Sequence, residues 1–85
     1  MSHHLTFKLY ASLGQYLPSG AVDNKARIEL AQDETLSELI ERFNLPSRLV
    51  HLVLIDGVYI APEDRPQRVL KDGETVAIWP PVAGG

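Results

Sequence analysis

The last six residues of the sequence are the ones best suited to chemistry. Residues 80–85 read Pro-Pro-Val-Ala-Gly-Gly. Two consecutive prolines favour a stiff, extended backbone that holds the following residues away from a folded body. Glycines at the tip carry no side chains, so a terminal carboxylate there can enter a narrow channel in another protein. This pattern predicts an extended tail over residues 80–85, with the carboxylate of Gly85 as its working part.

The other residue types offer little chemistry of their own. The sequence has no cysteine, which excludes disulfides, thiolate metal sites and a cysteine nucleophile. Of the three histidines, His3 and His4 fall in a terminus expected to be frayed, and His51 lies far away, so no metal site is predicted. No nucleophile, base and pocket can be assembled, so we expect no bound cofactor and no stand-alone enzymatic activity. The acidic residues near the expected helix are interpreted as solvated charges or caps: Glu29, Asp33, Glu34, Glu38 and Glu41.

Composition narrows the class of protein further. A length of 85 residues with 45% hydrophobic and 22% charged residues predicts a single domain over residues 1–85. The net charge is −3 and the basic residues are scattered, which argues against a nucleic-acid partner. No apolar stretch is long enough to cross a bilayer, and residues 1–4 do not resemble a signal peptide. We therefore expect a cytoplasmic protein without membrane partners.

The elements that must position the tail begin with a predicted hairpin and a helix. Apolar and polar residues alternate over residues 5–10 and 26–30, which predicts two half-buried strands. Residues 11–17 are ambiguous, with one helical turn as a candidate. Thr35 and Glu38 have the spacing of a capping box, and Asn44 and Pro46 end the helix that follows. The apolar stripe of this helix consists of Leu36, Leu39, Ile40 and Phe43.

Three further strands are predicted after the helix. Residues 50–55 are almost continuously apolar, as in a central strand covered on both faces. Asp56-Gly57 is a hairpin signal, and residues 58–60 return. The prolines and charges of residues 61–69 predict a surface loop, and residues 75–79 form the last strand before Pro80. By alternation Trp79 faces away from the helix. It is either an exposed anchor for a partner or a side chain packed over the sheet edge.

Together these elements predict an α+β fold, in which one main helix covers a mixed sheet of four to five strands in the chain order β-β-α-β-β-β. The predicted core consists of Leu5, Phe7, Ile28, Leu39, Phe43, Leu54, Val76 and Ile78.

Residues 71–85 resemble the ending of the MoaD/ThiS family of sulfur carriers. Residues 7–17 and 52–57 are also similar to the first strand and the central hairpin of that family. The Pro-Pro step before the glycines is closest to the MoaD branch, the small subunits of molybdopterin synthase, because ThiS-type carriers usually lack it. The loop at residues 61–69 looks long for the family, with Arg65-Pro66-Gln67 as an apparent insertion.

The resemblance implies a ubiquitin-like β-grasp fold and a specific chemistry. An adenylating enzyme related to ubiquitin-activating enzymes uses ATP to activate the terminal carboxylate, and sulfur from a donor protein then displaces AMP to leave a thiocarboxylate. Carried over to this sequence, Gly85 is adenylated and then bears the sulfur, while Gly84 is the spacer. The loaded tail then enters a larger catalytic subunit such as that of molybdopterin synthase. The expected partner contacts are Trp79, Pro80, Pro81, Val82 and Ala83.

Two alternatives keep the same activated carboxylate. In the first, the carrier serves another pathway, such as the formation of the thiamine thiazole, cysteine synthesis or tRNA thiolation. Alternatively, an amine replaces sulfur as the nucleophile, and the chain becomes a protein modifier joined through Gly85 to lysines. A passive interaction domain with incidental glycines is a further possibility, and it predicts no loss of function when Gly84 and Gly85 are deleted.

Overall fold

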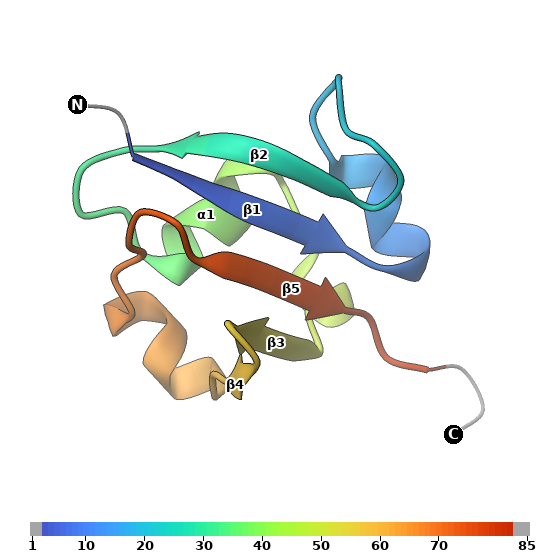
Figure 1. Cartoon of the computed structure of the whole chain (residues 1–85). Helices are drawn as coiled ribbons and strands as arrows, with labels where there is room; N and C mark the ends of the chain where they lie inside the picture. The colour runs from blue at the N-terminus through green and yellow to red at the C-terminus, as the bar shows by residue number, and fades with distance from the viewer. Residues whose placement is uncertain (1–2, 83–85) are drawn as a thin grey trace.

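Five strands form one mixed sheet in the spatial order β2-β1-β5-β3-β4, and the helix α1 packs against one face of it (Figure 1). The computed structural model describes residues 3–82. The strands are β1 (His3–Leu9), β2 (Lys25–Leu30), β3 (Leu52–Ile55), β4 (Val58–Tyr59) and β5 (Thr75–Trp79). The helical segments are α1 (Leu36–Arg42) and the short 3-10 helices η1 (Ala11–Tyr16), η2 (Ser47–Leu49) and η3 (Pro62–Gln67).

The strand pairing places β5 at the centre of the sheet. β1 and β2 form an antiparallel hairpin, and β1 pairs with β5 in parallel. β3 pairs antiparallel with β5 on one side and with β4 on the other. The predicted α+β class and the predicted order of elements are confirmed. His3 and His4 lie in β1 and pair with Leu30 and Glu29 of β2. The prediction of a frayed terminus at these two histidines is therefore wrong.

The helix is bounded by the predicted signals. The Thr35 hydroxyl accepts a hydrogen bond from the Glu38 backbone N–H at 3.2 Å, and the Glu38 carboxylate accepts one from the Thr35 N–H at 2.8 Å. At the other end Asn44 has φ 59°, and the Leu45 N–H donates to the Ile40 carbonyl at 3.1 Å. This left-handed termination satisfies carbonyls that the last helical turn leaves free.

The hydrophobic core lies between α1 and the sheet. Leu5, Phe7, Ile28, Leu39, Val76 and Ile78 are buried there, as predicted. Phe43 is only half-buried, and its ring lies 5.1 Å from that of Phe7. The prediction for Leu54 is wrong, because Val53 and Ile55 are the buried residues of β3 and Leu54 is half-buried on the opposite face. The strand is therefore covered on one face only, and not on both.

The segment predicted as a surface loop is also different in the structure. Residues 62–67 form the 3-10 helix η3, and the Arg65 side chain within it is buried. The backbone begins this turn at Pro62, where a proline is favourable because its nitrogen has no hydrogen to leave unpaired. Within residues 3–82, no helix is long and apolar enough to cross a membrane.

Candidate functional site

The tail begins at the end of β5, which is held by hydrogen bonds from both neighbouring strands. The Tyr10 N–H donates to the Ile78 carbonyl at 3.1 Å, and the His51 N–H donates to the Trp79 carbonyl at 3.1 Å. Leu52 is the Cα partner of Trp79 across the β3–β5 pair. The backbone is therefore paired up to Trp79, and the proline that follows has no N–H to extend the ladder.

Trp79 is packed against a second aromatic side chain. Its ring stacks on the Tyr10 ring with centroids 4.2 Å apart and an interplanar angle of 5°. Both residues are half-buried. Trp79 lies on the face opposite α1, as predicted. Its ring is half-buried against Tyr10, so it is not a freely exposed anchor. The stacked pair joins the last residue of β5 to the residue that follows β1, and aromatic contacts of this kind stabilise the relative placement of their two rings.

Beyond β5 the chain loses contact with the body step by step. Pro80 is half-buried and Pro81 is exposed, and Val82 is 78% exposed. Figure 1 shows the chain running outward from the end of β5 over these residues. The remaining predicted site residues, Ala83, Gly84 and Gly85, lie outside the described part of the chain.

The buried side chain of Arg65 binds backbone groups next to the start of the tail. The Arg65 Nε–H donates to the Ile60 carbonyl at 3.2 Å, and its Nη2 donates to the His51 carbonyl at 3.4 Å. His51 is the residue whose N–H binds the Trp79 carbonyl. Arg65 thus connects η3 to the strand end that holds the last residue of β5, although it does not itself touch Trp79 through a hydrogen bond.

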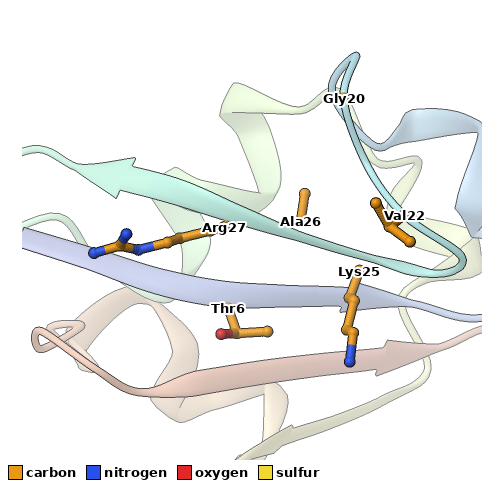
Figure 2. A pocket seen from close by; sticks show the side chains of 6 residues that line it. All are labelled: Thr6, Gly20, Val22, Lys25, Ala26 and Arg27. Atoms are coloured by element: carbon orange, nitrogen blue, oxygen red, sulfur yellow. The ribbon is translucent and has the colours of Figure 1, made fainter.

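The described residues include the start of the tail and the residues that hold it. Over residues 3–82 there is no group of three or more histidine, aspartate or glutamate residues that could hold a metal ion. A shallow pocket of about 280 Å³ lies at the β2 edge of the sheet (Figure 2). It contains none of the predicted site residues, since it is lined by Thr6, Gly20, Val22, Lys25, Ala26 and Arg27.

Sequence analysis did not assign two of the supporting residues, Tyr10 and Arg65, to the site. Tyr10 shares the polar phase of the first strand with Thr6 and Lys8, so alternation places it on the same face as Trp79. Its contact with Trp79 also depends on the parallel pairing of β1 with β5, which alternation does not reveal. Nothing in the sequence indicated that Arg65 is buried, because the prolines and acidic residues around it give this segment the composition of a solvated loop.

Comparison with known proteins agrees with this architecture. The structure is similar to the crystal structure of SAMP1 from Haloferax volcanii, with a TM-score of 0.65 and 24% identity over 96% of this chain and 99% of that one. It is also similar to the solution structure of the HVO 2177 protein of Haloferax volcanii, with a TM-score of 0.74 and 23% identity over 99% of this chain and 88% of that one. At these identities the likeness shows the fold, which is the expected ubiquitin-like β-grasp.

A search of curated proteins gave no match. The sequence model of the ThiS family, in contrast, matches residues 17–85, which include the helix, β3 to β5 and the whole tail. The chain therefore belongs to the ThiS family of ubiquitin-like sulfur carriers, the group that its ending, its first strand and its central hairpin had indicated.

Proposed function

We propose that this chain is a sulfur carrier that works through a thiocarboxylate at Gly85, in molybdopterin synthesis as the small subunit of molybdopterin synthase. The observation that carries the proposal is the position of the Pro-Pro-Val-Ala-Gly-Gly sequence directly after a strand paired on both sides. A rigid strand end followed by an exposed segment is suited to insertion into a partner. Residues 1–85 act as one domain in this proposal, and residues 80–85 act as its tail.

The chemistry follows from the weak electrophilicity of a carboxylate, whose charge is delocalised over two oxygens. An adenylating partner joins the Gly85 carboxylate to the AMP portion of ATP, and pyrophosphate leaves. The acyl adenylate has a good leaving group, so the outer sulfur of a persulfide on a donor protein attacks the Gly85 carbonyl carbon and AMP leaves. A thiol then cleaves the resulting acyl disulfide, which frees the thiocarboxylate and leaves a disulfide between the donor and that thiol. Because ATP is consumed, we place the reaction in the cytoplasm. The carrier itself holds no cofactor in this scheme.

The residues of the tail have separate roles in the proposal. Gly85 carries the reacting atoms, and Gly84 lets the backbone pass a narrow channel because it has no side chain. Pro80 and Pro81 keep the segment extended, and Val82 and Ala83 supply small apolar contacts to the partner's channel. Trp79 contacts the rim of that channel, since it is the last residue held by the sheet.

The pathway rests on the Pro-Pro step, which favours a molybdopterin synthase subunit over a carrier for the thiamine thiazole. The alternative of a protein modifier uses the same acyl adenylate, with a lysine amine in place of sulfur. The two schemes differ in the product at Gly85, which is a thiocarboxylate in one and an isopeptide bond in the other.

The test is ATP-dependent sulfur transfer to Gly85. The purified chain is incubated with an adenylating enzyme, ATP and a sulfur donor protein, and the C-terminal peptide is then examined by mass spectrometry. We expect replacement of one terminal oxygen by sulfur at Gly85, and its absence without ATP or in a chain lacking Gly85. The increase in mass from this replacement is almost equal to that from adding one oxygen atom. The fragment spectrum must therefore place the increase on Gly85, and not on an oxidised Met1 or Trp79.

The same reaction separates the alternatives. Supply of the loaded chain to a molybdopterin synthase large subunit should convert the pterin precursor, whereas conversion by another acceptor only would overturn the assigned pathway. Conjugates joined through Gly85 to lysines, without any thiocarboxylate, would replace the carrier by the modifier. No change at Gly85 with an adenylating enzyme that activates other carriers would refute both.

A further inference from the structure

The outer edge of β2 has one residue with both backbone groups left unpaired. β2 is an edge strand, with β1 on one side only. The Leu9 N–H donates to the Asn24 carbonyl at 2.9 Å, which sets the phase of the β1–β2 ladder, because hydrogen-bonded and non-hydrogen-bonded pairs alternate in an antiparallel sheet. The Thr6 N–H points away from β2 and donates to the Glu74 carbonyl at 3.0 Å. Arg27, the register partner of Thr6, therefore turns its N–H and C=O outward.

The outward backbone groups on either side of Arg27 are already occupied. At one end of the edge Lys25 and Val22 exchange backbone hydrogen bonds of 3.0 and 3.1 Å. At the other end the Arg42 Nη2 donates to the Glu29 carbonyl at 2.8 Å. Among the residues that the structure describes, none pairs with the backbone of Arg27 on this side. The edge is thus closed at both ends and open for one pairing unit between them.

The pocket at the β2 edge lies along this opening. Ala26 and Arg27 line it from the strand, and Gly20 and Val22 line it from the preceding loop. Figure 2 shows this loop running beside β2. Val22 is 66% exposed, and Ala26 is half-buried against the core. A strand that paired with Arg27 would therefore find apolar side chains next to the open backbone groups.

The charge at the pocket is positive. Lys25 and Arg27 both line it, and both side chains are exposed. Within residues 3–82 the two ion pairs involve other basic residues, so no acid of that region forms a salt bridge with either of these two. Glu29 follows Arg27 on the same face, which leaves the Lys25 side of Arg27 the more positive. A carboxylate placed opposite Arg27 in an added strand would form a favourable cross-strand pair.

A second copy of this chain is a less suitable occupant of the edge. Two β2 strands joined symmetrically through their free backbone groups would place the two Arg27 side chains directly opposite each other. Like charges in this position destabilise a sheet, and charged side chains on edge strands commonly prevent such pairing. The same charge that disfavours a second copy favours an acidic strand, so Arg27 selects between the two.

We propose that the β2 edge binds a short extended segment of a partner protein, which adds one strand to the sheet at Arg27. The central residue of the segment is acidic and lies opposite Arg27. Its two neighbours point to the other face because side chains alternate along a strand, and they are apolar where they meet Val22 and Ala26. β1 separates this edge from β5, so a bound segment does not engage the tail. The site tethers the chain to a partner, whatever the chemistry of the tail.

The test uses the isotope-labelled full chain and the peptide acetyl-Ser-Val-Asp-Val-Ser-amide at low ionic strength, followed by NMR. We expect the Arg27 amide signal to move most and its hydrogen exchange to slow. The Kd should be about 1 mM, because the contact consists of two backbone hydrogen bonds, one ion pair and little buried area. A peptide with lysine in place of aspartate should bind about tenfold more weakly. A peptide methylated on the aspartate nitrogen keeps its charge but cannot donate to the Arg27 carbonyl, and should bind about fivefold more weakly.

Two variants of the chain complete the test. Arg27→Glu should lose the aspartate peptide and bind the lysine peptide instead, a gain that an unfolded chain would not show. Arg48→Glu makes the same change at an exposed position of η2 and should bind as wild type. An unmoved Arg27 amide at about 10 mM aspartate peptide, or an affinity unchanged by methylation, would overturn strand addition. An Arg27 signal that moves with the concentration of the chain itself would assign the edge to a second copy and overturn the proposal.

Discussion

Removal of the Arg65 guanidinium should destabilise the fold measurably, since it donates to two partly buried backbone carbonyls. The side chain is 7% exposed and donates to the carbonyls of Ile60 and His51 at 3.2 and 3.4 Å. Arg65→Met keeps an apolar stem of similar length but leaves both acceptors without this donor. Hydrogen bonds from a charged donor contribute about 1.5–3 kcal/mol each, and these are long. Burying methionine also removes the cost of burying a charge. We therefore expect a net loss of about 2 kcal/mol.

A loss of this size leaves the protein folded but easy to distinguish from wild type. A chain of this length is expected to have a free energy of unfolding of about 4–13 kcal/mol. The midpoint of thermal unfolding should fall by about 8–16 °C, because each kcal/mol shifts a small domain by about 4–8 °C. Urea unfolding can be followed by the fluorescence of Trp79, the single tryptophan of the sequence. The slope with denaturant should stay unchanged, as no new surface is exposed in the native state.

The matched control is Arg48→Met, which changes the same side chain at an exposed position of η2. Exposed substitutions of this kind usually alter stability by less than about 0.5 kcal/mol. If Arg65→Met and Arg48→Met unfold at the same urea concentration, the two carbonyls find other partners. The assignment of Arg65 as the support of the tail start would then be wrong.

Two further changes test the helix and the aromatic pair. Thr35→Ala removes the hydroxyl that accepts from the Glu38 N–H and should lower the free energy of unfolding by about 1 kcal/mol in the same urea titration; an unchanged midpoint would show that water replaces the cap. Tyr10→Leu keeps apolar bulk but removes the stacking partner of Trp79, and should cost about 0.5–1.5 kcal/mol beyond any loss of buried area and shift the Trp79 emission to longer wavelength. An emission spectrum identical to wild type would mean that the stack does not persist in solution.

Local signals in the sequence predicted the elements with good accuracy. The Thr35 and Glu38 pair is a short-range motif, and both of its hydrogen bonds are present. Alternation in the first strand assigned Phe7 to the core because polar residues separate it from Leu5 and Leu9, and in the last strand the small Ala77 separates Val76 from Ile78. These predictions succeed because the chemistry that decides them lies within a few residues.

The errors occurred where apolar and polar residues do not alternate regularly along the sequence. The run at residues 50–55 is almost continuously apolar, so nothing in it distinguishes the face of Val53 from that of Leu54. The face is decided by the antiparallel register with β5, in which Val53 lies opposite Ile78. Arg65 was misjudged for a related reason, because its acceptors belong to Ile60 and His51 and no local pattern links them.

In the candidate site, too, some features depend on one segment of the sequence and others depend on the pairing of strands. The proposed reactive end of the chain is visible in the sequence, because the chemistry proposed for it depends on consecutive residues and on no contact elsewhere. The position of Lys8 opposite Lys25 is not visible, although alternation places both among the outward residues of their strands. It depends on the register of β1 against β2, which is selected by the burial of Leu5, Phe7 and Ile28 under α1. The placement of outward side chains is therefore a property of the sheet as a whole, whereas the chemistry proposed for the tail is a property of the last few residues of the chain.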